Sequence, residues 1–260
     1  MTAAIEAIHL RKTFGPVVAV DNVDITVASG QTVALLGGNG AGKTTTISML
    51  LGLLLPSAGR ITILGHDLAR TRYAVMARMN FSSPYVELPH RLTVAQNLRV
   101  YADLYGVADA AERVAELAER LDLTQFLDRP SGKLSAGQKT RLALAKSLIN
   151  RPEVLLLDEP TASLDPDTGD WVRGYLEQYR AETGASMLIA SHNMNEVERL
   201  CDHVLMMRAG RIVDQDAPAA LLARYGRQTL EDVFLDIARD RRSAAAPAGT
   251  PDSAGEQAAQ

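Results

Sequence analysis

The segment from Gly37 to Thr44 reads GGNGAGKT and constrains the fold more than any other part of the chain. It follows a continuously apolar run, Thr32 to Leu36, which is typical of a strand buried on both faces of a sheet. A helical segment comes next. Glycines let successive backbone N–H groups point at one anion, and the helix N-terminus adds the positive end of its dipole. The pattern G-x-x-x-x-G-K-[ST] in this context predicts a phosphate-binding loop.

Two side chains of this phosphate loop suit a bound nucleotide. We expect Lys43 to neutralise the β- and γ-phosphates and the hydroxyl of Thr44 to ligate Mg²⁺. The alternative is a glycine-rich turn without chemistry, which the strand before it and the helix after it argue against. The residues expected to bind the nucleotide here are Gly37, Gly38, Asn39, Gly40, Ala41, Gly42, Lys43, Thr44 and Thr45.

A second apolar run ends in two acidic residues. Val154 to Leu157 reads VLLL and is followed by Asp158 and Glu159. Ligands of open α/β sheets bind at the carboxyl ends of the strands, where this pair is expected to lie. We expect Asp158 to be a metal ligand for Mg²⁺. Glu159 is the expected catalytic residue that orients or deprotonates a water for attack on the γ-phosphate.

The first third of the chain alternates short β-like runs with turn residues. The runs Ala3–Leu10, Val17–Val27 and Arg60–Leu64 predict an antiparallel sheet. Two later runs, Val154–Leu157 and Met187–Ala190, read as strands buried on both faces. Together with the phosphate loop they predict an α/β fold.

The middle of the chain, from about residue 88 to residue 150, is predicted to be a helical subdomain. Thr93 and Gln96 form a capping box, and Gly106 is placed to end the helix that follows. A second helix carries Val114, Leu117 and Leu121 on one face.

Composition excludes several classes of protein. A chain of 260 residues with 47% hydrophobic content can bury a sizeable core, and a net charge of −4 offers no basic surface, so no nucleic-acid partner is expected. The single cysteine, Cys201, and the lack of an N-terminal signal favour a reducing cytosolic compartment. The longest near-apolar stretch, Ile47–Leu55, is far shorter than the ~20 residues of a membrane helix, so a role at a membrane requires a partner.

The segment Leu134–Gln138 reads LSAGQ and resembles the signature motif of ABC ATPases, usually LSGGQ, with Ala136 in place of a glycine. Ser135 and Gln138 also form a capping box, so the same segment begins a helix predicted to run to Asn150. The two interpretations are compatible, because a helix start with a serine hydroxyl and a glycine N–H is an anion site.

Further residues follow the order of the same family. Ser163–Asp165 resembles its D-loop, His192 after the run MLIAS resembles its switch histidine, and Phe14 stands where the family stacks an aromatic ring on adenine. The resemblance covers roughly the first 235 residues and implies a P-loop NTPase (ABC ATPase) core with an antiparallel β subdomain and an inserted helical subdomain. It adds His192 as a catalytic residue and, as nucleotide-binding residues, Phe14, Ser135, Ala136, Gly137, Gln138 and Asp165.

The resemblance implies ATP and Mg²⁺ as cofactors and a second copy of the chain, or a homologous ATPase subunit, as a partner. ATP on the phosphate loop of one copy is completed by Ser135 and Gly137 of the other, and hydrolysis involving Glu159 and His192 reopens the dimer. A transmembrane permease subunit is the other implied partner. It would hold the chain at the cytoplasmic face of the cell membrane.

Three functions share these motifs. The ending Thr229–Leu235, TLEDVFL, is similar to ATPase subunits of bacterial exporters and favours export over import. A soluble ABC ATPase of translation or DNA maintenance is the first alternative, although the chain has neither a second such domain nor a long coiled-coil insert. A regulatory module that binds ATP and barely hydrolyses it is the second.

One family feature is absent. The family has a glutamine at the end of the strand that enters the helical subdomain, whereas Met79–Tyr85 contains none. We expect Ser82 or Ser83 to supply a hydroxyl oxygen through a bridging water, and hydrolysis to be slower or more dependent on the partner.

The expected domains are an ABC ATPase domain over residues 1–235 and a C-terminal extension over residues 236–260. The extension ends in AAAPAGTPDSAGEQAAQ, which lacks the apolar content to order itself and is predicted to be mostly disordered.

Overall fold

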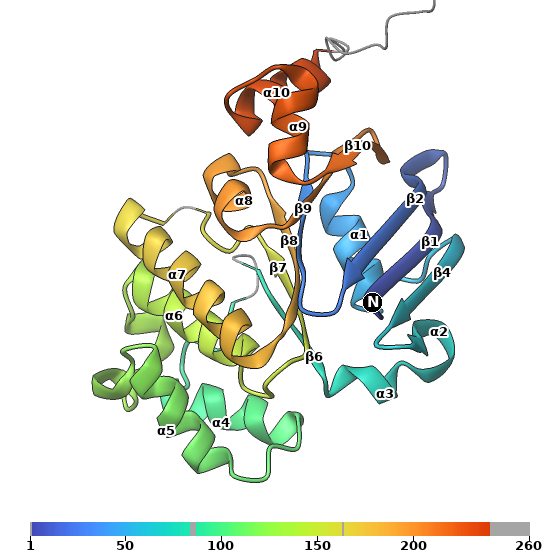
Figure 1. Ribbon diagram of the computed structural model, residues 1–260. Coiled ribbons are helices and arrows are strands. Elements are labelled where there is room, and N and C mark those ends of the chain that lie inside the picture. The colour runs from blue at the N-terminus through green and yellow to red at the C-terminus, as the bar shows by residue number, and fades with distance from the viewer. Residues whose placement is uncertain (1, 84–86, 163, 240–260) are drawn as a thin grey trace, which may run out of the picture.

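The computed structural model describes residues 2–83, 87–162 and 164–239 of the protein. Two β-sheets lie side by side, and helices cover them (Figure 1). The strands are β1 (Ala3–Phe14), β2 (Val17–Ala28), β3 (Thr32–Leu36), β4 (Ala58–Ile63), β5 (His66–Asp67), β6 (Met79–Ser82), β7 (Val154–Asp158), β8 (Ser186–Ser191), β9 (His203–Arg208) and β10 (Arg211–Asp216).

The helices fall before, within and after the predicted helical insert. They are α1 (Lys43–Leu50), α2 (Leu68–Thr71), α3 (Tyr73–Met76), α4 (Val94–Leu104), α5 (Ala110–Arg120), the 3₁₀ turns η1 (Thr124–Phe126) and η2 (Ser131–Lys133), α6 (Ala136–Ser147), α7 (Pro166–Thr183), α8 (Met194–Leu200), α9 (Pro218–Tyr225) and α10 (Leu230–Ala238).

The central sheet has the strand order β10-β9-β3-β8-β7-β6. Strands β9, β3, β8, β7 and β6 pair in parallel, and β10 joins the edge in the antiparallel direction. Every residue of β3, β7 and β8 is buried, as a strand covered on both faces requires. The predicted α/β fold is confirmed.

Successive side chains of these strands enter two different cores, because neighbouring residues of a strand point to opposite faces. In β3, Ala34 and Leu36 pack into the core shared with α4–α8. Val33 and Leu35 pack into the core shared with α1 and the antiparallel sheet. The central sheet is therefore the common wall of both cores.

The second sheet, β2-β1-β4-β5, is antiparallel, as predicted from the opening third of the chain. Strand β1 pairs with β2 on one side and with β4 on the other. It runs to Phe14, beyond the Leu10 at which its sequence pattern stops. Ile47 and Leu50 of α1 fill the space between the two sheets.

The helical insert lies between β6 and β7 and forms the lower left of the molecule in Figure 1. Both predicted capping boxes are confirmed: Thr93 with Gln96 at the start of α4, and Ser135 with Gln138 at the start of α6. Gly106 follows α4 with a positive φ of 67°, and the face carrying Val114, Leu117 and Leu121 is buried.

Two elements differ from the sequence prediction. Helix α6 ends at Ser147 rather than Asn150, because Arg113 donates hydrogen bonds to the carbonyls of Leu148 and Ile149 and caps the helix there. Strands β9 and β10, joined by a turn at Gly210, were not predicted, although β9 is buried over most of its length.

The C-terminal part of the described chain folds over one end of the central sheet as α9 and α10 (Figure 1). Helix α10 crosses the expected boundary between residues 235 and 236, and the remainder of the predicted disordered extension, residues 240–260, lies outside the described residues. Across the described ranges no helix is long and apolar enough to cross a membrane. Cys201 is buried, and burial raises the pKa of its thiol, in agreement with an unreactive core cysteine.

We predict that replacing Gly42 destabilises the fold strongly, and Gly40 in the same loop provides the matched control. Both have positive φ, 108° and 76°, but a Cβ at Gly42 would lie 2.7 Å from the carbonyl oxygen of Ala19, whereas nothing lies within 4 Å of one at Gly40. We expect Gly40→Ala to cost about 1 kcal/mol and Gly42→Ala at least about 2 kcal/mol more. Thermal melting followed by circular dichroism measures both, and equal Tm values would contradict the prediction.

Candidate functional site

The phosphate loop connects the end of β3 to the start of α1, where the sequence places it. Lys43 is buried, and its Nζ donates hydrogen bonds to the carbonyl oxygens of Gly37 at 2.6 Å and Gly38 at 3.4 Å. The ammonium group therefore lies inside the loop. Thr44 is exposed on the first turn of α1, so its hydroxyl is accessible from solvent.

Strand β9 closes one side of the loop and explains the glycine at its start. A Cβ at Gly37 would lie 2.5 Å from the carbonyl oxygen of Met207, which is closer than real contacts allow. The backbone N–H of Gly210 donates to the carbonyl of Ala41 at 2.9 Å. Neighbouring backbone thus holds the loop from outside, while inside the loop the N–H of Ala41 donates to the carbonyl of Gly38 at 3.1 Å.

Asp158 ends β7 at the carboxyl edge of the central sheet and is 3% exposed. Burial raises the pKa of its carboxyl, the charge of Glu159 adds to this, and the nearby Lys43 acts in the opposite direction. A metal ion would favour the ionised form. One carboxylate and one hydroxyl, Asp158 and Thr44, are hard oxygen donors that suit Mg²⁺ held mainly by phosphates.

Glu159 lies beside Asp158 in a left-handed conformation, with φ of 52°, which turns its side chain away from the strand direction. Its backbone N–H donates to the carbonyl of Ala190 at the end of β8, at 2.8 Å. Its Oε2 lies 2.7 Å from Nδ1 of His192. The loop after β7 and the loop after β8 therefore meet at this pair.

The His192 side chain is exposed, whereas the Glu159 side chain is 11% exposed. The 2.7 Å separation indicates that Nδ1 carries the hydrogen and donates to the carboxylate. The backbone N–H of His192 also faces Glu159 Oε2, at 3.4 Å. This arrangement orients a carboxylate that can accept a proton from water.

The signature segment lies at the start of α6, next to the start of α7. Ser135 and Ala136 are exposed, and Gly137 is close to Thr168, since a Cβ there would lie 3.3 Å from Thr168 Oγ1. Asp165 caps α7 by accepting from the backbone N–H of Thr168 at 3.0 Å. Ser163 of the predicted D-loop lies outside the described residues.

Lys146, in the last turn of α6, links the signature helix to β6. Its Nζ donates to the carbonyl of Phe81 at 3.0 Å and to Asn80 Oδ1 at 3.2 Å. Burial lowers the pKa of Lys146 to about 8. Ser82, the last residue of β6, pairs with Leu157 of β7, so Ser83 comes level with Asp158.

Phe14 ends β1 at the tip of the antiparallel hairpin, where its side chain is 48% exposed and Lys12 Nζ lies 5.1 Å from its ring centroid. Lys12 lies over one face of the ring, so stacking on adenine would use the opposite face or would displace Lys12. The structure thus brings the phosphate loop, Asp158, Glu159 and His192 to one sheet edge, while Phe14 and the signature segment lie on separate subdomains.

Sequence reasoning missed Phe234 of α10. It lines a cavity of about 370 Å³ together with Gly38 and Met207, and a Cβ at Gly38 would lie 3.9 Å from its Cζ. The carbonyl of Ile237 accepts from Arg208 of β9, which seats the helix there. The motif containing Phe234 was noted only for its similarity to exporters, and nothing local to it indicates this contact.

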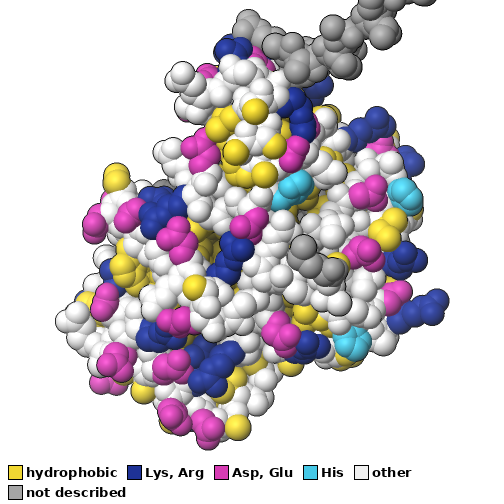
Figure 2. All heavy atoms as spheres, in the orientation of Figure 1, with side chains coloured by type: hydrophobic (Ala, Val, Ile, Leu, Met, Phe, Trp, Pro, Cys, Tyr) yellow, Lys and Arg dark blue, Asp and Glu magenta, His cyan; other side chains and the backbone are white. Residues whose placement is uncertain are grey.

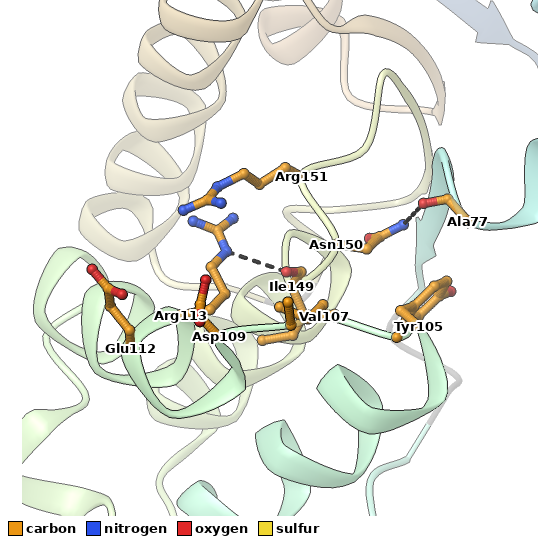
Figure 3. A pocket seen from close by; sticks show the side chains of 11 residues that line it. Ala77, Tyr105, Val107, Asp109, Glu112, Arg113, Ile149, Asn150 and Arg151 are labelled. Carbon is orange, nitrogen blue, oxygen red and sulfur yellow. Dashed lines mark hydrogen bonds between the residues drawn. The ribbon is translucent and has the colours of Figure 1, made fainter.

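A second cavity, of about 470 Å³, lies between the ends of α4 and α6 and shares no lining residue with the phosphate loop (Figure 3). Arg113 points across it toward Ile149, and its guanidinium binds Glu116 at 2.8 Å besides the two carbonyls at the end of α6. Asn150 binds the carbonyl of Ala77 at 2.9 Å. These polar groups hold the insert to the sheet.

Comparisons with known proteins agree with this arrangement. The family model for the ABC transporter matches residues 20–162. The Nod factor export ATP-binding protein I of Cupriavidus metallidurans is 37% identical over 224 residues, covering 85% of this chain and 74% of that protein. An ATP-binding subunit of an ABC transporter has a TM-score of 0.83 at 26% identity, covering 91% of this chain and 100% of that one.

A dimeric ATP-binding cassette, MJ0796 in a post-hydrolysis state bound to ADP and Pi, has the same fold, with a TM-score of 0.75 at 21% identity over 82% of this chain and 98% of that one. The family model covers more than half of the chain, and the Nod factor relative is well above 30% identical. The chain therefore belongs to the ABC transporter family and is one of its ATP-binding, ATP-hydrolysing subunits.

Proposed function

We propose that this chain hydrolyses MgATP at the edge of its central sheet and uses two copies of itself to drive a membrane permease, most simply for export. The observation that supports it best is the 2.7 Å contact between Glu159 Oε2 and His192 Nδ1, beside the phosphate loop and Asp158. A contact that only joined two loops would not require a left-handed Glu159 at the end of a buried strand.

Each side chain has a role in this proposal. The loop N–H groups and Lys43 bind the β- and γ-phosphates, while Thr44 and Asp158 hold Mg²⁺, which neutralises charge that develops on the phosphates. Glu159 accepts a proton from the attacking water, and His192 keeps its carboxylate oriented. Phe14 stacks on the adenine ring.

A second copy completes the site in this proposal. Ser135 and Ala136 are exposed at the start of a 12-residue helix, where the hydroxyl and free N–H groups can bind the γ-phosphate of ATP held by the partner. Asp165, Gly137 and Gln138 order the same surface. The dimeric form of a solved relative with this fold supports the arrangement.

A permease partner is supported by apolar side chains left in solvent. Leu53, Leu55, Tyr73 and Leu104 are each more than 70% exposed, and side chains of this kind are available for contact with a partner protein. Tyr73 begins α3 and Leu104 ends α4, and both helices lie along the lower edge of Figure 1. Attachment there would hold the chain at the cytoplasmic face of the membrane.

The direction of transport is proposed from similarity. The relative from Cupriavidus metallidurans is named as an export protein, and it matches 85% of this chain. A DNA-maintenance role is less well supported, because Lys and Arg side chains are interspersed with Asp and Glu on the face shown in Figure 2. Retention of both Glu159 and His192 argues against a module that binds ATP without hydrolysing it.

Replacing the proposed base tests the catalytic part. We expect Glu159→Gln to lower kcat at least about 100-fold, since it removes the proton acceptor, and to keep ATP affinity, since the phosphate loop is untouched. Glu182→Gln, on the exposed end of α7, is the control and should keep the unaltered rate. Steady-state phosphate release and equilibrium ATP binding measure both, and unchanged hydrolysis in Glu159→Gln would contradict the role.

The same variant tests the partners. Glu159→Gln loaded with ATP should remain dimeric and should retain its membrane partner when tagged protein is isolated from detergent-solubilised membranes. Recovery of a stoichiometric multi-spanning protein supports the transporter. Recovery of ribosomes or DNA in its place would point to a soluble ABC ATPase.

The segment that lacks glutamine generates a further prediction. Ser83 is buried level with Asp158, so a longer side chain there can reach Mg²⁺ without a bridging water. We expect Ser83→Gln to raise kcat or reduce the Mg²⁺ concentration needed for half-maximal rate by about threefold, and Ser82→Gln to act less. Unchanged turnover and Mg²⁺ dependence in both variants would show that this segment has no catalytic role.

A further inference from the structure

Behind the catalytic pair lies a buried carboxyl to which no role has been assigned. Glu196, in the first turn of α8, is 0% exposed, and its Oε1 accepts a hydrogen bond from Thr161 Oγ1 at 2.9 Å. Its other oxygen, Oε2, is buried without a hydrogen-bond partner among the residues that the structure describes. A buried carboxyl in this state costs free energy relative to a well-packed apolar side chain.

Thr161 belongs to the turn that begins at Glu159. The N–H of Ala162 donates to the carbonyl of Glu159 at 3.1 Å, and the N–H of Leu164 donates to the carbonyl of Thr161 at 3.3 Å. Thr161 is therefore a fixed point of the chain two residues beyond the catalytic carboxylate.

Glu196 belongs to the segment that carries His192. Ser191 ends β8, and its Oγ accepts from the N–H of Asn193 at 3.0 Å. Asn193 in turn caps α8 by accepting from the N–H of Glu196 at 3.3 Å. The side chain of Glu196 thus extends from the loop after β8 back to the loop after β7.

The Thr161–Glu196 hydrogen bond joins these two loops at a buried point, behind the contact of Glu159 with His192. The backbone hydrogen bond from Glu159 to Ala190 fixes where the loops leave the sheet, and the Thr161–Glu196 hydrogen bond adds a buried side-chain constraint two residues beyond Glu159. We propose that Glu196 is a positioning residue that holds Thr161 and so keeps Glu159 and His192 in the geometry needed for ATP hydrolysis. This inference rests on the proposed function.

Burial raises the pKa of Glu196, and the negative charge of Glu159 adds to the effect, while the nearby Ser191 and Thr161 hydroxyls and Arg173 oppose it. A glutamine side chain has nearly the same shape as that of Glu196 and keeps one oxygen that can accept from Thr161. Glutamine is therefore the conservative replacement.

Four variants of the full-length chain test the proposal. Glu196→Met keeps the volume but removes the acceptor, and Thr161→Val removes the donor. Glu196→Gln keeps the hydrogen bond. Glu198→Gln is the control, because Glu198 is on the same helix but accepts from the N–H of Leu230 instead. Steady-state ATP hydrolysis gives kcat and KM for each, and thermal melting gives Tm.

We expect Glu196→Met and Thr161→Val each to lower kcat by about 10- to 100-fold, because misplacing the reacting groups slightly has effects of this size. KM for ATP should stay within about twofold, since the phosphate loop is intact. The Tm of Glu196→Met should not fall, whereas Thr161→Val leaves the buried carboxyl without its donor and should melt at a lower temperature. Glu196→Gln and Glu198→Gln should keep the unaltered kcat. The double variant of Thr161 and Glu196 should be no slower than the slower single variant.

Three results would overturn the proposal: unchanged kcat in Glu196→Met and Thr161→Val, equal losses in Glu196→Gln and Glu196→Met, or a fall in the Tm of Glu196→Met with KM and kcat changing together. The last result would indicate a purely structural role. Failure of the proposed function itself is distinguishable, because the unaltered chain would then show no ATP hydrolysis that depends on Glu159.

Discussion

The burial of β3 on both faces is the constraint on which the rest of the structure depends. Its five residues are all buried, and they alternate between the core of the helical insert and the core of the antiparallel sheet. Strand β3 pairs with β8 on one side and with β9 on the other, so the loop that follows its last residue begins between two fixed strands. The packing of β3 therefore fixes the position of the phosphate loop. Strand β7 runs in the same direction and is separated from β3 only by β8, so the acidic residues at its end lie at the same edge of the sheet.

The catalytic edge combines a rigid part with a more adjustable part. Lys43, Gly37 and Asp158 are held by buried strands and by backbone from β9. Glu159 and His192 are carried by two loops whose side chains contact each other at a partly exposed position. Under the proposed function, phosphate binding would depend on the sheet, while the chemical step would depend on how those two loops are held together.

The parts of this fold that could be predicted from sequence have local signals. The phosphate loop, the strands β3, β7 and β8, and both capping boxes are contained in short runs whose residue types determine the backbone. The antiparallel sheet could also be predicted, because turn residues separate its strands.

The arrangement of the site could not be predicted to the same extent. The hydrogen bond of Thr161 with Glu196 joins residues 35 positions apart, and neither residue has an unusual sequence context. The contact of Phe234 with Gly38 also depends on tertiary packing, here that of α10. Strand β9 was missed as well, although it forms one wall of the phosphate loop.

Helix α6 has the exposed Ser135 as its N-cap and Lys146, bound to Asn80 and Phe81, in its last turn. Its 12 residues form a rod of roughly 18 Å without a glycine or proline break in its second half. A rotation of the exposed end of this rod would therefore strain the hydrogen bonds of Lys146 to Asn80 and Phe81, or move β6 with it.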